Sequence, residues 1–127
     1  MKTGFEMIDT SAFDQFIALW GNEAGPVIGE IAGMFLENAP KLLEEMAQAL
    51  ESGNAQELRR LAHTFKSNAA TVGARPLAAL CQKLEDAAKE NRLEDARTLF
   101  RQIQEMYPQT RDELTEFLEA FKTPNSE

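Results

Sequence analysis

The chain has 127 residues, of which 43% are hydrophobic, and it carries a formal net charge of −8 at pH 7. This length suits one compact domain with its own core and is too short for a catalytic domain joined to a regulatory one. The acidic charge argues against nucleic-acid binding, which requires a clustered basic surface.

The sequence gives no sign of secretion or membrane insertion. Residues 1–14 mix charged side chains with isolated apolar ones and therefore do not resemble a signal peptide. No stretch approaches the roughly 20 apolar residues of a membrane span. The single cysteine, Cys81, cannot form an internal disulfide and belongs to no cluster of zinc ligands. We expect a cytoplasmic monomer without a metal site, and a free-standing one because the chain opens with Met1 and closes with a polar tail.

A short helix is predicted first. Its apolar positions follow helical spacing and are Phe13, Phe16, Ile17 and Trp20. The residues that can cap its N-terminus are Asp9, Thr10 and Ser11. Gly21 and the Gly25–Pro26 pair are expected to break the chain between this helix and the next.

A long second helix is predicted to extend to Gly53. Its apolar stripe comprises Ile28, Ile31, Phe35, Ala39, Leu42, Met46 and Ala49. Pro40 should kink this helix rather than end it, because the stripe stays in phase across the proline.

The third helix is predicted over residues 55–72. Asn54 and Glu57 have the spacing of an N-cap and its reciprocal partner, and Gly73 should stop the helix. The residues expected to face inward are Leu58, Leu61, Ala62, Phe65, Ala69 and Val72.

Two more helices complete the pattern. Pro76 suits the first turn of the fourth helix, which should end near Asn91, and its stripe comprises Leu77, Leu80, Cys81, Leu84 and Ala88. The stripe of the last helix comprises Leu99, Ile103, Met106, Thr110, Leu114, Phe117 and Phe121. We expect a kink or a break at Pro108, and a frayed polar tail over residues 122–127.

No segment has the alternating pattern of a strand, and the connections are short. Neighbouring helices should therefore lie antiparallel. The predicted fold is all-α, an up-and-down antiparallel four-helix bundle with a short extra N-terminal helix. We expect one domain over residues 1–127, with its core at about residues 9–121.

His63 is the only histidine, and it lies away from the core stripe of the third helix. At about 100° per residue, the opposite pole of the helix is occupied by Leu58, Leu61, Phe65 and Val72. The face within about 60° of His63 includes Arg59, Lys66, Ser67 and Ala70. A buried, satisfied histidine is therefore disfavoured, which leaves an exposed functional histidine or a plain surface one.

Cationic side chains surround His63 although the protein is acidic. Arg59 and Arg60 precede it by one turn, and Lys66 follows it by one turn. A phosphoryl group on a ring nitrogen would need such donors and positive charge, and a neutral imidazole is nucleophilic near pH 7. The alternative is that these charges only solvate an exposed face, which fits Arg60 better than Lys66.

Residues 62–85, AHTFKSNAATVGARPLAALCQKLE, resemble the signature of histidine-containing phosphotransfer (HPt) domains. That pattern is roughly A-H-x-x-K-G-S-x-x-x-x-G-A-x-x-L-x-x-x-C-x-x-L-E. The matching residues are His63, Lys66, Gly73, Ala74, Leu77, Cys81, Leu84 and Glu85. The resemblance implies a four-helix bundle phosphorylated on His63, with Lys66 stabilising the phosphoryl group.

The sequence departs from this signature at two positions. Ser67 stands where the family has glycine, and it is small enough to leave the histidine accessible to a partner. Asn68 stands where the family has serine. Because Asn68 lies about 140° from His63, we expect it to be largely buried and to find hydrogen-bond partners, for example on a neighbouring helix. The preference for partners could therefore differ from the family norm.

The resemblance also assigns Gln82 and Glu85 on the fourth helix to the neighbourhood of the ring. Glu85 could then accept a hydrogen bond from one ring nitrogen and leave the other free to attack phosphorus. The alternative is that both are ordinary solvated side chains. Cys81 falls on the apolar stripe and should be a core residue.

The resemblance implies a phosphorelay intermediate whose partners are receiver domains of response regulators or of hybrid histidine kinases. The expected docking residues are Arg59, Arg60, Ser67 and Ala70. No cofactor is expected, because Mg²⁺ would be bound by the partner receiver domain. We expect a carrier rather than an enzyme, since no phosphate-binding loop or kinase signature is present.

One alternative is an adaptor that docks receiver-like partners without phosphorylation. Another, an enzyme with His63 as general base, is disfavoured because no nucleophile is placed to form a dyad.

Overall fold

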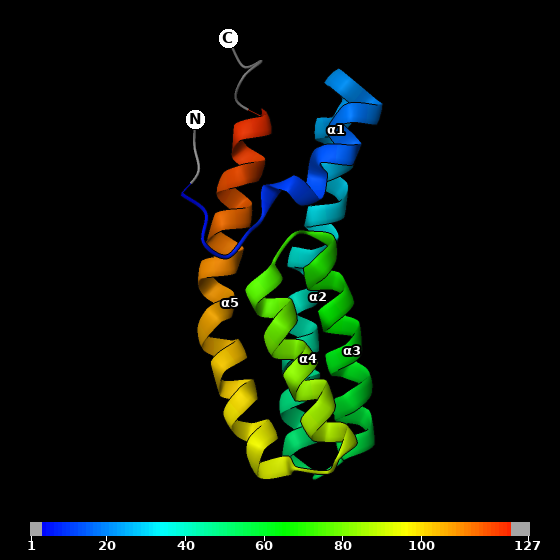
Figure 1. The fold of residues 1–127 in the computed structure, drawn as a ribbon, viewed down its shortest axis with the longest axis vertical. Coiled ribbons are helices and arrows are strands. Elements are labelled where there is room, and N and C mark those ends of the chain that lie inside the picture. The colour runs from blue at the N-terminus through cyan, green and yellow to red at the C-terminus, as the bar shows by residue number, and fades with distance from the viewer. Residues whose placement is uncertain (1–3, 123–127) are drawn as a thin grey trace.

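Four long helices form an antiparallel up-and-down bundle in the computed structural model, which describes residues 4–122 and their side chains as far as residue 120 (Figure 1). The bundle helices are α2 (Ala24–Glu51), α3 (Ala55–Thr71), α4 (Arg75–Lys89) and α5 (Leu93–Lys122). Each helix packs on its neighbours in the chain, and α2 packs on α5 to close the bundle. The predicted fold class is confirmed. The predicted frayed tail at 122–127 and the Phe121 side chain lie outside what the structure describes.

The core fills the space between these four helices. Every residue predicted to face inward from α3 is buried, with at most 1% of its surface exposed. Leu77, Cys81 and Leu84 of α4 are likewise fully buried, whereas Leu80 is only half-buried. None of the described helices combines the length and the apolar composition that a membrane span requires.

The short N-terminal helix is present, but it buries less than its pattern predicts. A 3₁₀ turn (η1, Thr10–Phe13) leads into α1 (Asp14–Trp20), and a second 3₁₀ turn (η2, Gly21–Glu23) joins α1 to α2. Phe13 is fully buried, whereas Ile17 and Trp20 are 41% and 49% exposed. The cause is the position of α1 beyond the α3–α4 connection, where α2 is the only bundle helix against which it packs extensively (Figure 1).

Of the two breaks predicted near α1, one is present and the other is absent. Gly21 ends α1 with a positive φ of 56°, as expected. The Gly25–Pro26 pair does not break the chain, because α2 already begins at Ala24. Pro26 lies in the first turn of α2, where a missing backbone N–H removes no intrahelical bond.

Both internal prolines lie within continuous helices. α2 passes through Pro40, in agreement with the prediction that it would not end there, and α5 passes through Pro108 without a break. Both prolines are exposed. On the solvent side of a helix, the carbonyl that a proline ring displaces can tilt outward and bind water, while the opposite face keeps its packing.

The ends of α3 fix the register of the helix that carries His63. Asn54 Oδ1 accepts a hydrogen bond from Glu57 N at 3.1 Å, as predicted for an N-cap. The reciprocal bond is absent, because Asn54 N donates to Ala49 O and the Glu57 carboxylate binds Arg60 instead. Beyond the other end, Gly73 has a φ of 76°, and a Cβ there would lie 2.3 Å from Asp9 O. Only glycine fits this close approach.

The N-terminal strap, residues 5–9, is held by a buried carboxylate on α5. Glu113 is 8% exposed, and its side chain accepts hydrogen bonds from the backbone N–H groups of Glu6, Met7 and Ile8 at 3.2, 2.7 and 3.2 Å. The strap crosses α5 (Figure 1), and the Phe5 ring packs edge-on against Phe117 with centroids 6.4 Å apart. No local sequence pattern predicts this contact.

Candidate functional site

His63 lies near the middle of α3 on the face that points away from the core. Its side chain is 60% exposed, whereas Ala62 and Phe65 of the same helix are completely buried. The structure therefore places the ring where a partner can reach it, as the helical geometry predicts. Together with Glu85, Arg59 and Arg60, it lines a surface hollow of about 620 Å³.

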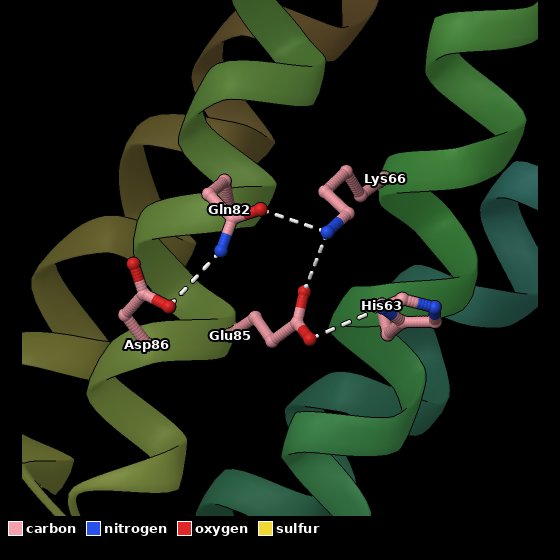
Figure 2. Close-up of polar contacts among 5 residues, drawn as sticks. All are labelled: His63, Lys66, Gln82, Glu85 and Asp86. Carbon is pink, nitrogen blue, oxygen red and sulfur yellow. Dashed lines mark hydrogen bonds and ion pairs between the residues drawn. The ribbon is translucent and has the colours of Figure 1, made fainter.

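A carboxylate from α4 orients the imidazole ring. Glu85 Oε2 lies 3.1 Å from His63 Nδ1, and Figure 2 shows the carboxylate between the histidine and Lys66. An ionised carboxylate only accepts hydrogen bonds, so the pair favours the tautomer with hydrogen on Nδ1. The lone pair then resides on Nε2, which points away from Glu85 in Figure 2.

Lys66 connects the same carboxylate to Gln82. Lys66 Nζ lies 3.0 Å from Glu85 Oε1 and donates a hydrogen bond to Gln82 Oε1 at 2.7 Å. Among the described residues, Glu85 Oε1 accepts no well-directed hydrogen bond, so its attraction to Lys66 is that of an ion pair. Gln82 thus lies beside the lysine rather than against the ring, and its Nε2 donates to Asp86 Oδ1 at 3.0 Å.

Asp86 belongs to this network although sequence reasoning missed it. Its i,i+4 spacing from Gln82 was the available signal, since side chains four residues apart on a helix are neighbours. The network as a whole brings two residues of α3 together with three of α4 (Figure 2).

The electrostatics of Glu85 favour its ionised form. Partial burial alone would raise the pKa of this carboxyl, but the contacts with Lys66 and His63 outweigh burial and hold the pKa below its ordinary value. The carboxylate is therefore charged near neutral pH and available as an acceptor for the ring N–H.

The four residues expected to contact a partner, Arg59, Arg60, Ser67 and Ala70, are all exposed. Arg60 forms an ion pair with Glu57 on its own helix, which matches the view that it mainly solvates the surface. Arg59 forms no ion pair with any described residue, so its charge remains available.

Two other residues near the site were singled out from the sequence. Asn68 is half-buried rather than largely buried. Its side chain makes no hydrogen bond with another described residue, so the prediction of a hydrogen-bond partner on a neighbouring helix is wrong. It lines two surface hollows between α2 and α3. Cys81 is fully buried, and burial raises the pKa of its thiol to about 12, which makes it an inert core residue.

Comparisons with known proteins identify the family to which the chain belongs. The sequence model of the Hpt domain family matches residues 30–113, which is more than half of the chain. Multistep phosphorelay regulator 1 of Schizosaccharomyces pombe is 24% identical over 81 residues, which span 64% of this chain and 28% of the length of that protein.

A solved structure shares the fold. The crystal structure of histidine-containing phosphotransfer protein B (HptB) from Pseudomonas aeruginosa PAO1 superimposes with a TM-score of 0.78, at 24% identity, over 90% of this chain and 96% of that one. The chain therefore belongs to the Hpt domain family, whose members carry phosphoryl groups in two-component phosphorelays and are not themselves catalysts.

Proposed function

We propose that His63 accepts a phosphoryl group from the aspartyl phosphate of a receiver domain and passes it to the aspartate of a response regulator. The observation that carries this proposal is the contact between His63 Nδ1 and Glu85 Oε2 beneath an exposed ring. That contact leaves Nε2 of the neutral ring as an accessible nucleophile.

The transfer balances without any movement of the Nδ1 proton. The Nε2 lone pair attacks phosphorus, the bond from phosphorus to the aspartyl oxygen breaks, and its electron pair returns to the receiver carboxylate. The ring then carries hydrogen on Nδ1 and phosphorus on Nε2, and its positive charge faces the Glu85 carboxylate. In the reverse step, neutral imidazole is the leaving group, so the same arrangement serves phosphoryl acceptance and donation.

Lys66 is the cation best placed to stabilise the phosphoryl group. It lies one helical turn after His63, and its ammonium group is held by Glu85 and Gln82. Both contacts are near the surface, where such interactions are weak, so the lysine can turn toward a dianion that arrives on Nε2. In-line transfer also needs Mg²⁺, which we assign to the acidic pocket of the receiver domain.

Intact-mass analysis after mixing with a phosphorylated receiver domain tests the proposal. We expect one added phosphoryl group that acid treatment removes, and no addition to the His63→Gln variant. The variant should keep the parental circular dichroism spectrum and melting temperature, because the side chain lies outside the core. Binding of the receiver without any gain in mass would instead support the adaptor alternative, and labelling of the variant would move the site elsewhere.

A further inference from the structure

Two hollows lie side by side in the seam between α2 and α3. The first has a volume of about 180 Å³ and a mostly apolar wall formed by Ile31, Met34, Phe35 and Val72. The second has a volume of about 230 Å³, and Thr64, Lys41 and Glu45 contribute to its wall. Asn38 of α2 and Asn68 of α3 line both hollows and so form the boundary between them. The seam thus contains an apolar hollow, and two amides separate it from a second hollow with charged residues in its wall.

Both amides have unused hydrogen-bonding capacity. The side chains of Asn38 and Asn68 make no hydrogen bond with another described residue. Each side-chain amide offers two donor hydrogens and two acceptor lone pairs, which in this seam only water can meet. Water bound at such a site can be replaced by a partner that reproduces its hydrogen bonds.

The opposite flank of His63 differs in this respect. There Lys66, Gln82 and Glu85 are engaged with one another and, through Gln82, with Asp86. A partner that approached only from that flank would have to disrupt these contacts before making its own. Apart from the unpaired charge of Arg59, the α2 flank therefore offers a partner the two amides that no described side chain engages.

The seam lies within reach of any protein that docks on His63. A standard interface covers about 800 Å² on each partner, which corresponds to a disc of roughly 16 Å radius. Asn68 follows His63 by five residues, a rise of about 7.5 Å along α3. Ser67 lies between them around the helix and is exposed, so no bulky side chain of α3 separates the ring from the seam.

We propose that the α2–α3 seam is the specificity-determining part of the receiver-domain interface, an inference that rests on the function proposed above. The receiver inserts one apolar side chain into the hollow beside Met34. An adjacent polar group of the receiver, which both donates and accepts hydrogen bonds, binds the amides of Asn38 and Asn68. Met34 is 57% exposed and flexible enough to adapt to the inserted side chain. An amide at position 68 reaches further than the serine of the family signature, so this seam selects a different partner surface from a serine-bearing one.

The expected effect follows from the number of hydrogen bonds lost. Each bond to a neutral amide changes an equilibrium constant about five-fold, so removal of both amides should raise the KM for the receiver roughly 10- to 30-fold. The kcat should change little, because neither residue touches the His63 ring.

The test uses the full chain and compares two phosphoryl donors. The variants are Asn38→Ala combined with Asn68→Ser, Met34→Ala alone, and Gln104→Ala as a control that removes an exposed amide from α5, a helix that lines neither hollow. The donors are phosphoramidate, which needs no docking surface, and the phosphorylated receiver domain that transfers fastest to the parental protein. Melting curves of all variants should overlay the parental curve, since the side chain of neither asparagine makes a hydrogen bond with a described residue.

We expect the double variant and Met34→Ala to show a raised KM with the receiver and parental rates with phosphoramidate, while Gln104→Ala behaves as the parent with both donors. A parental KM in the double variant, or an equal loss in Gln104→Ala, would overturn the inference. Failure of phosphoramidate and the receiver alike to label His63 in the parental protein would overturn the proposed function, and the inference with it.

Discussion

Replacement of Glu113 by alanine should detach the N-terminal strap and destabilise the whole domain. The carboxylate accepts three backbone hydrogen bonds from residues 6–8. Bonds to a charged group contribute about 1.5–3 kcal/mol each, but water can replace them once the strap leaves the surface, so their sum overstates the loss. Once the strap detaches, the domain loses the free energy of the strap's other contacts, and this sets the upper limit of the destabilisation. Burial of Ile8 contributes about 2 kcal/mol, and the bond from Asp9 N to Gly73 O contributes about 1 kcal/mol.

We therefore expect Glu113→Ala to lower the free energy of unfolding by about 3 kcal/mol, which for a domain of this size corresponds to a drop in Tm of roughly 10–15 °C. Thermal and urea unfolding followed by circular dichroism measure this directly. Glu116→Ala, which removes an exposed carboxylate one turn further along α5, is the matched control and should melt as the parent does. Amide hydrogen exchange at residues 6–8 should accelerate only in Glu113→Ala. A loss below about 1 kcal/mol, or no larger than that of the control, would refute the assignment of Glu113 as the anchor.

Three further predictions concern the phosphotransfer face. Lys66→Ala should slow transfer or shorten the phosphohistidine lifetime several-fold. Arg60→Ala should have a smaller effect, because its guanidinium is ion-paired with Glu57 of the same helix. Stopped-flow transfer assays that gave equal rates for both variants would contradict the electrostatic argument. Ser67→Trp should block transfer from a receiver domain yet permit labelling by phosphoramidate, since reacting atoms must approach to roughly 3–3.5 Å; receiver transfer at the parental rate would show that the partner approaches from another side. Because the pKa of Glu85 is lowered in the folded protein, its contacts add stability above the ordinary pKa of 4.5, and this contribution is lost as the pH falls through the lower folded-state pKa. Glu85→Gln should therefore lose less stability between about pH 6 and pH 3 than the parent. An unchanged pH dependence of urea unfolding would contradict this.

The helices were predictable where a single periodicity decided the outcome. The bounds and inward face of α3 follow from an N-cap at Asn54, an unbroken apolar stripe and a glycine after its end. Of the kink or break predicted at Pro108, the break is absent. A proline costs about 3 kcal/mol in a helix interior, but Pro108 lies on the exposed side of α5. Buried residues on either side, Ile103 and Leu114, keep α5 continuous across it.

Contacts between distant segments were not predictable in the same way. The sequence placed an acidic residue, Glu113, beside the apolar positions of the last helix, but nothing local indicates that its partners are backbone groups more than 100 residues earlier. The exposure of Ile17 and Trp20 depends on α1 lying beyond the end of α3, which is a property of the assembled bundle. For the candidate site, helical geometry placed His63 and Lys66 on one face, while the approach of Glu85 came from a family resemblance and not from spacing. The contact of Asp86 with Gln82 had a signal in their i,i+4 spacing, whereas the partnerless side chain of Asn68 required the structure itself.

The contact between Phe5 and Phe117 brings the first and last described segments together on α5, the helix diagonally across the bundle from α3 (Figure 1). A domain fused before the strap or after α5 would therefore leave the molecule on the side opposite His63. To reach the ring, a tethered receiver must pass about 35 Å around a bundle whose helices are each about 10 Å wide, which a flexible linker of about 40 residues can span. Such a tether would hold the receiver at an effective concentration up to the millimolar range, so it would outcompete free receivers at micromolar levels. A much shorter tether would leave His63 to free partners alone.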